Sequence, residues 1–242
     1  MRFMNKKFLC FLLCLTTILA FGIIAYADES SEDTSSVAQS SDLPDIDIYS
    51  WELVFCNKYN SIGPYSTTQA ACVYGDNGVD IRIYDYVVEL VDACRSAGYP
   101  CYVNRGNRNW SYLLSNVEYQ LKNVYDNDAY EMSKHILLPG CNEHQTGLCI
   151  DITADPTYSD NWNDQIDDWT VTSDTWQWMK EHCAEYGFII RYPEGKESYY
   201  GIACCPTHIR YVGKEAATYI MENDLCLEEF LMLYGYPVNL PN

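Results

Sequence analysis

Two short stretches hold the side chains best suited to metal or proton-transfer chemistry. Only four histidines occur among the 242 residues, and His144 lies in PGCNEHQTGLCID whereas His208 lies in CCPTHIRYVG. Imidazole nitrogens and carboxylate oxygens are common zinc ligands, and Asp151 ends the first stretch. The spacing alone is a weak metal signal, because a structural histidine and a capping aspartate would give the same pattern.

The chain between His144 and Asp151 has to bend if both residues bind one metal ion. On a straight strand their separation would be about 23 Å, with the two side chains on opposite faces. Gln145-Thr146-Gly147 is the place for a bend, because glycine tolerates backbone angles that other residues avoid. Leu148 and Ile150 then predict a buried strand that carries Asp151.

The other predicted elements do not alternate regularly between helix and strand. Apolar residues at helical spacing predict helices over 79–97, 111–125, 214–223 and 227–234, and one more that Ser173 or Asp174 caps and Gly187 ends. Strands are predicted over 51–55, 101–103, 188–192 and 209–212. Such an order favours an α+β fold over a doubly wound sheet.

The first 27 residues have the organisation of a secretory signal peptide. Three basic residues precede the apolar run FLCFLLCLTTILAFGIIA, and Ala25-Tyr26-Ala27 supplies a cleavage site. An uncleaved membrane anchor is the alternative, because the run is long enough to span a bilayer. Residues 28–50 are acidic and rich in serine, which predicts a disordered linker before a globular domain over 51–242. We expect a secreted or cell-wall-associated protein without membrane contact beyond the signal segment.

Charge and cysteine content narrow the partners and the redox setting. Removal of the signal peptide takes three of the 15 basic residues and none of the 34 acidic ones, so the net charge becomes 12 − 34 = −22. Such a surface repels nucleic acid and anionic lipid. Two of the 12 cysteines lie in the signal segment, and the even number that remains predicts disulfides of unknown pairing. Nothing indicates an oligomer, and we expect a monomer.

Several motifs, in order, resemble a known enzyme family. PGCNEHQTGLCIDI, YGFIIRYPEGKESYYGI, HIRYVG and CLEEFL are similar to segments of the zinc D-alanyl-D-alanine carboxypeptidases of the VanY type, which trim the peptide stems of bacterial peptidoglycan. The resemblance extends from about Trp51 to about Leu233. It implies a single α+β domain with a small antiparallel sheet flanked by helices, like the hedgehog and DD-peptidase domains. We expect disulfides to reinforce it.

The resemblance also implies a zinc site. His144, Asp151 and His208 match the family's three ligands, and one Zn²⁺ per chain would keep its fourth position open for water. Arg108 matches the arginine that holds the terminal carboxylate of the substrate, a group suited to its planar guanidinium. The implied partner is therefore a peptidoglycan stem peptide. His135 and His182 match no family ligand.

Two departures from the family pattern put activity and substrate preference in question. The family has Glu-Pro-Trp-His where this chain has Cys205-Pro206-Thr207-His208, so a cysteine replaces the glutamate that acts as general base. The run that holds the substrate carboxylate is Ser-Gly-Tyr-Arg-Ser in the family, and both of its serines are replaced, by Arg105 and Asn109.

Three hypotheses follow from these motifs. The chain is a zinc D,D-carboxypeptidase, or a catalytically disabled zinc-bound module that binds wall peptide or a protein partner, or a metal-free protein whose histidines are structural. The matched ligands favour the first hypothesis and Cys205 favours the second. Loss of a general acid/base typically slows a reaction by about 10²–10⁴-fold.

Overall fold

A four-stranded antiparallel sheet carries the candidate site. The computed structural model describes residues 43–64, 70–74, 77–155 and 171–241. The strands are β3 (Tyr102–Arg105), β4 (Cys149–Thr153), β5 (Phe188–Tyr192) and β6 (Cys205–Tyr211), in the order β3-β4-β6-β5. In this register Asp151 of β4 lies opposite His208 on one neighbouring strand and opposite Arg105 on the other. The sheet therefore brings three distant segments of the chain to one place.

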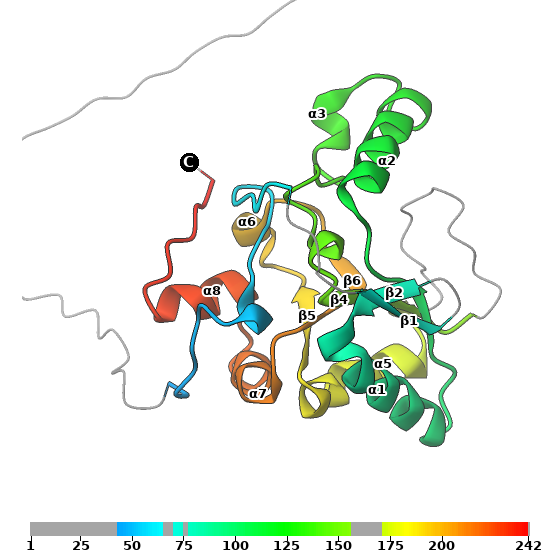
Figure 1. The fold of residues 1–242 in the computed structure, drawn as a ribbon, viewed down its shortest axis with the longest axis vertical. Helices are drawn as coiled ribbons and strands as arrows, with labels where there is room; N and C mark the ends of the chain where they lie inside the picture. Colours follow the sequence, from blue (N-terminus) through cyan, green and yellow to red (C-terminus); the bar gives the residue numbers. More distant parts are fainter. Residues whose placement is uncertain (1–42, 65–69, 75–76, 156–170, 242) are drawn as a thin grey trace, which may run out of the picture. The chain divides into compact units, whose positions relative to one another are not determined.

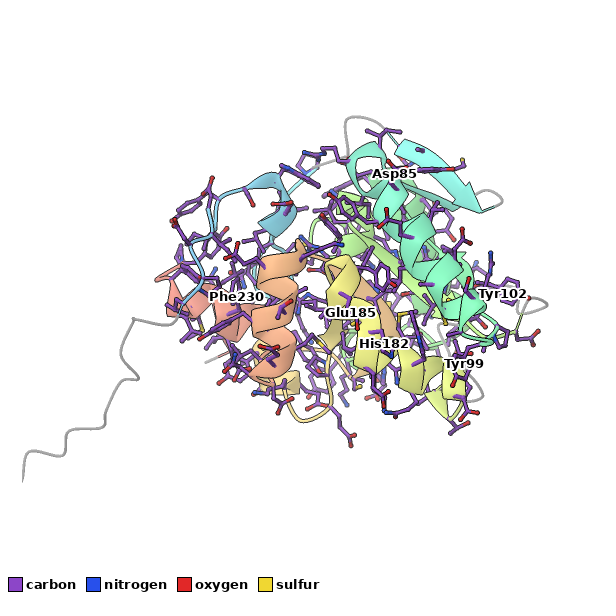
Figure 2. The ribbon with its side chains drawn as sticks, turned by 90° about the horizontal axis from the view of Figure 1, so that it is seen from below. Asp85, Tyr99, Tyr102, His182, Glu185 and Phe230 are labelled. Carbon is purple, nitrogen blue, oxygen red and sulfur yellow. The ribbon has the colours of Figure 1, made fainter. Side chains whose placement is uncertain are left out.

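One face of this sheet is apolar and packs on two helices. Ile150, Phe188 and Ile209 point into a buried cluster shared with α1 (Tyr84–Ser96) and α5 (Asp174–His182). The helices α1 and α5 lie beside each other against the sheet (Figure 1), and Figure 2 shows this helical layer from below. Because side chains alternate along a strand, the residues between these positions point to the opposite face.

The opposite face of the sheet is buried as well, but it carries charged groups. Arg191 and Arg210 are both fully buried there, on β5 and β6. A second apolar cluster borders them, built from Ile189, α7 (Lys214–Glu222) and α8 (Leu227–Leu233). Charged side chains are seldom buried without partners, so this face is where chemistry or ion pairing is expected.

Shorter elements complete the described fold. They are η1 (Trp51–Leu53), β1 (Ala70–Tyr74), β2 (Asn77–Asp80), η2 (Ile81–Ile83), α2 (Trp110–Asn123), α3 (Ala129–Met132), η3 (Glu143–Thr146), η4 (Cys183–Tyr186) and α6 (Glu197–Tyr200). β1 and β2 pair as a separate antiparallel ribbon, and α2 and α3 lie together, far from α1 and α5 (Figure 1). The α+β architecture with a small antiparallel sheet flanked by helices is confirmed.

The predicted strand over 51–55 is wrong. Trp51–Leu53 forms a 3-10 turn, and the residues after it stay irregular. The Nη2 atom of Arg210 donates to the carbonyl oxygens of Glu52 (2.9 Å) and Val54 (2.7 Å). A buried guanidinium thus takes the place of the neighbouring strand that would have paired with these carbonyls.

Several predictions for the N-terminal region fall on residues outside the described part. The signal peptide over 1–27 and the linker up to residue 42 lie there. Residues 43–50, which we placed in the linker, already contact the domain: Ile48 is buried, and Tyr234 donates a hydrogen bond of 2.6 Å to the carbonyl of Pro44. Among the described residues, no helix has the length and apolar character needed to cross a bilayer.

The disulfide reinforcement that we expected is not formed in the structure. All ten cysteines after the predicted signal segment are free thiols: Cys56, Cys72, Cys94, Cys101, Cys141, Cys149, Cys183, Cys204, Cys205 and Cys226. Three of them, Cys94, Cys101 and Cys183, lie in the apolar cluster under the sheet, where a thiol packs like a small hydrophobic side chain. Cys94 and Cys101 are close enough for their thiols to form a hydrogen bond with each other.

Candidate metal and peptide-binding site

The turn that carries His144 is built as the sequence predicted. Asn142 caps η3 by accepting a hydrogen bond of 3.0 Å from the backbone N–H of His144. The turn ends at Gly147, whose φ of 73° lies in the left-handed region. Such an angle favours glycine, and it redirects the chain into β4 so that Asp151 comes back toward His144.

The three predicted ligands converge in the structure. The Nε2 atom of His144 lies 3.3 Å from Oδ2 of Asp151, and Nδ1 of His208 lies 2.9 Å from Oδ1 of the same carboxylate. All three side chains are buried. Their adjacency comes from the sheet, because Asp151 and His208 are partners across β4 and β6.

The hydrogen bonds around the two imidazoles fit a bound cation. Nδ1 of His144 lies 2.7 Å from the carbonyl oxygen of Gly106, so it carries the proton and donates it. In the neutral ring Nε2 is then an acceptor that faces the acceptor Oδ2 of Asp151, a contact that needs a proton or a cation between the atoms. On His208, Nε2 has no hydrogen-bond partner and lies 3.7 Å from Oε2 of Glu143. A carboxylate behind a ligating imidazole orients the ring toward a metal.

The electrostatic environment of Asp151 also favours a positive charge next to its carboxylate. Burial by itself raises the pKa of Asp151, but His144 and His208 outweigh it and hold the pKa well below its usual range. Nη1 of Arg105 lies 3.6 Å from Oδ2 of Asp151 and adds a further positive charge. A metal ion at this carboxylate would therefore share it with one guanidinium.

Cys149 supplies a fourth donor that the sequence reasoning did not assign to the site. Its sulfur and one ring nitrogen each of His144 and His208 lie within 4.8 Å of one another, a grouping suited to a metal ion. Burial raises the pKa of Cys149, but the two imidazoles outweigh burial and bring the pKa to about 7. Asp151 is outside this grouping of three, but its carboxylate contacts both of the same imidazoles.

A cavity of about 140 Å³ opens directly onto these groups. Arg108 and Cys205 both line it, together with His144, Asp151 and His208. The backbone N–H of Arg108 donates to the carbonyl of His144 (2.9 Å), which fixes the loop of Arg108 against the metal-site turn. The predicted carboxylate-binding arginine and the predicted ligands thus face one space, large enough for the end of a peptide.

Comparison with known proteins identifies this arrangement. The model of the family described as VanY, D-alanyl-D-alanine carboxypeptidase, matches residues 76–214, which contain the three predicted ligands and Arg108. The chain belongs to the VanY family. A D-alanyl-D-alanine carboxypeptidase of Enterococcus faecalis is 32% identical over 211 residues, which cover 85% of this chain and 73% of that protein.

Solved structures of VanY relatives have the same fold. A glutamate-to-alanine mutant of the vancomycin resistance D,D-pentapeptidase VanY, in complex with Zn(II), is 30% identical with a TM-score of 0.64, covering 75% of this chain and 99% of that one. VanYB in complex with D-alanine-D-alanine is 31% identical with a TM-score of 0.64, covering 76% and 98%. The LdcB LD-carboxypeptidase, whose structure addresses peptidoglycan recognition, is 27% identical with a TM-score of 0.55, covering 74% and 79%.

Cys205, which the family resemblance places at the position of the general base, lines the cavity with a thiol in place of a carboxylate. Burial raises the pKa of its thiol to about 12, so the group stays protonated near neutral pH. The side chain packs beside an apolar cluster that contains Leu137, Tyr192 and Ile202. A neutral thiol can neither take a proton from water nor act as a carboxylate.

The two remaining histidines take no part in the convergence. His182 lies at the end of α5, 2.8 Å from Oε1 of Glu185, and Figure 2 shows both on the helical layer. His135 is exposed and stacks near Tyr125, although it also lines the cavity. Neither histidine belongs to the grouping of metal donors, and neither matches a ligand of the VanY pattern.

The sequence reasoning also missed a buried ion network behind the site. Nε of Arg191 and Nη1 of Arg210 each lie 2.8 Å from Oε1 of Glu143, and Nη2 of Arg191 lies 2.7 Å from Oε1 of Glu228. Arginines within otherwise apolar strands were the available sign, because a charge at a core position needs a partner.

Proposed function

We propose that this VanY-family chain is an exported zinc protein that binds peptidoglycan stem peptides ending in D-alanyl-D-alanine and hydrolyses them slowly. The observation that carries the proposal is the convergence of His144, Asp151 and His208 on one cavity that Arg108 also lines. Zinc bound there would supply Lewis acidity toward the peptide carbonyl. The apolar N-terminal run and the chemistry of the family support a location at the cell wall.

The chain's own residues have separable roles in this proposal. Gly106 and Glu143 orient the rings of His144 and His208, respectively, through the nitrogens that do not face Asp151. Arg108 holds the terminal carboxylate of the peptide with its planar guanidinium. Cys205 occupies the place of the proton-transfer group without performing that step, so we expect turnover about 10²–10⁴-fold below that of a variant with a base.

A second candidate is a module that binds wall peptide, or a protein partner, with no hydrolysis. The specific observation in its favour is the neutral, half-buried thiol of Cys205. Glu143 offers no replacement base, because both arginines of the network already hold one of its oxygens and the residue is inaccessible. The two candidates share the zinc site and the peptide and differ only in turnover.

One experiment tests the proposal. Zinc per chain and release of D-alanine from a stem pentapeptide are measured for the domain without its signal segment and for Cys205→Glu, Cys204→Glu and His208→Ala. We expect one zinc, weak release from the unchanged domain that His208→Ala abolishes, and a marked increase in Cys205→Glu. Cys204→Glu is the matched control, because it places the same carboxylate one residue away.

Each other outcome decides against part of the proposal. Zinc and peptide binding without release from the unchanged domain leave the second candidate. A chain that binds no zinc refutes both candidates and leaves the histidines with a structural role. An increase of the same size in Cys204→Glu would show that the gain does not come from the base position.

A further inference from the structure

We infer that Cys149 is a protein ligand of the metal ion and takes the fourth position beside His144, Asp151 and His208. The inference rests on the proposed zinc site and deepens it, because a fourth protein ligand changes what that site can do. No motif of the family points to this residue. It is the structure that places its sulfur among the imidazoles.

The strand geometry aims Cys149 at the site. Cys149 and Asp151 are two residues apart on β4, so their side chains leave the same face of the sheet. Between them, Ile150 points into the apolar cluster on the other face. Cys149 is fully buried, and its sulfur and one ring nitrogen of each histidine lie within 4.8 Å of one another.

Coordination would require the donor atoms of Cys149, His144 and His208, which lie within 4.8 Å of one another, to move closer together. Zinc–sulfur bonds of about 2.3 Å and zinc–nitrogen bonds of about 2.0–2.1 Å put tetrahedral donors roughly 3.5 Å apart. Thiolate and imidazole together form one of the commonest zinc donor sets.

The balance of charges around the site also favours a thiolate at Cys149. Replacing the family's glutamate with Cys205 removes one negative charge from the cavity, and Arg105 adds a positive charge 3.6 Å from Asp151. Coordination would convert the Cys149 thiol to a thiolate, with its proton released to solvent as the sulfur–zinc bond forms. The negative charge lost at position 205 is thereby restored next to the metal.

The functional consequence is a closed site. Four protein ligands are typical of structural zinc, whereas catalytic zinc keeps one position open. Cys205→Glu alone would then restore only part of the turnover, since the thiolate competes for the open position. Adding Cys149→Ala to Cys205→Glu would remove that competitor, and we expect release of D-alanine to rise at least tenfold over Cys205→Glu.

Cobalt substitution tests the inference without relying on activity. The zinc of the domain is exchanged for Co²⁺, and the near-ultraviolet thiolate-to-cobalt charge-transfer band is recorded for the unchanged domain, Cys149→Ser, Cys205→Ala and Cys204→Ala. We expect the band in the unchanged domain, its loss in Cys149→Ser, and its persistence in both other variants. Cobalt per chain and far-ultraviolet circular dichroism establish that each variant is loaded and folded.

Affinity gives a second readout. Partners that only support a ligand typically change metal affinity by about 10–100-fold, so removal of a ligand should weaken chelator-competed zinc binding by at least that factor. Cys149→Ser should show this loss and Cys204→Ala should not. Should Cys149→Ser fold poorly, Cys149→Ala gives the same comparison in an apolar side chain of smaller size.

The outcomes separate this inference from the proposed function. Bound cobalt without a charge-transfer band overturns the inference and leaves the zinc site intact. A band that survives Cys149→Ser and disappears in Cys205→Ala assigns the ligand to Cys205 instead. A band with the expected behaviour in a domain that binds no stem peptide supports the inference and contradicts the proposed function. Failure to bind any metal refutes both.

Discussion

Arg191 and Arg210, on adjacent strands, bind the same carboxylate oxygen of Glu143, each at 2.8 Å. Glu143 directly precedes His144, and its second oxygen lies 3.7 Å from Nε2 of His208. The carboxylate is fully buried, and although burial raises its pKa, the two arginines outweigh that effect and hold the pKa well below its usual range. This one group ties β5 and β6 to the turn that carries the first predicted ligand.

Glu143→Gln is therefore expected to destabilise the domain strongly. The amide leaves two buried guanidinium groups with less negative charge than they need, and breaking a buried ion pair typically costs about 3–5 kcal/mol. The free energy of unfolding is measured by urea denaturation with a chelator present, so that metal binding does not contribute. Glu131→Gln removes an exposed carboxylate that pairs with Lys134 and is the control, with little expected change. Equal effects of the two substitutions would contradict the role of the network.

Gly147 should be far less replaceable than another glycine with a similar backbone. A Cβ at Gly147 would come within 2.9 Å of the backbone nitrogen of Asp80, whereas one at Gly195 would meet nothing within 4 Å. Both have positive φ, so either alanine costs about 1–2 kcal/mol in strain. We expect Gly147→Ala to cost more than Gly195→Ala and, in addition, to weaken zinc binding in chelator competition. A similar loss of zinc affinity in both variants would show that the turn does not position His144.

The family resemblance assigned the three predicted ligands, and local rules explain how two of them approach each other. The turn at Gly147 and the strand of Leu148 and Ile150 follow from backbone freedom and apolar alternation, and they bring Asp151 back toward His144. The same alternation puts Cys149 on the face of Asp151, but we interpreted that cysteine as a disulfide candidate. The role that we infer for Cys149 also depends on the imidazole of His208 from another strand, which local sequence does not locate.

The buried arginines show where local patterns stop being informative. Arg191 and Arg210 meet Glu143 across 48 and 67 residues of chain, respectively. No periodicity selects that partner among the many acidic residues. The failed strand prediction over 51–55 has the same origin, because Arg210 occupies the carbonyls that a neighbouring strand would have used. Long-range contacts of Arg210 therefore contribute to the structure of this segment in a way that strand propensity does not predict.

Stability should depend on pH through Glu229 at the start of α8. Its carboxylate lies 2.7 Å from Nζ of Lys196 and accepts a hydrogen bond of 2.9 Å from the N–H of Cys226. Burial raises the pKa of Glu229, but these two partners outweigh burial and lower the pKa below 4.5. A lowered pKa in the folded state means that the stabilisation is complete above about pH 4.5 and is lost as the pH falls through the folded value.

The measurement compares urea denaturation of the unchanged domain and Glu229→Gln between pH 7 and pH 3, with metal chelated. We expect the variant to be less stable at pH 7, by no more than about 1 kcal/mol because the pair is partly exposed, and the difference to vanish at the acid end. A difference that stays constant across this range would mean that the charge of Glu229 does not stabilise the fold.

Arg108 should recognise the free carboxylate at the end of the stem peptide. A hydrogen bond to a charged group contributes about 1.5–3 kcal/mol, so Arg108→Gln is expected to weaken binding of a peptide ending in D-alanyl-D-alanine by about 10–100-fold. The peptide affinity of Arg108→Lys should lie between those of the unchanged domain and Arg108→Gln, because lysine keeps the charge but not the planar pair of donors.

Binding is measured calorimetrically on zinc-loaded protein, and the same peptide with an amidated end is the control. The amidated peptide should bind weakly and equally to all three proteins, because it lacks the group that Arg108 contacts. Were Arg108→Gln to weaken both peptides by the same factor, the arginine would be supporting the cavity wall rather than reading the carboxylate.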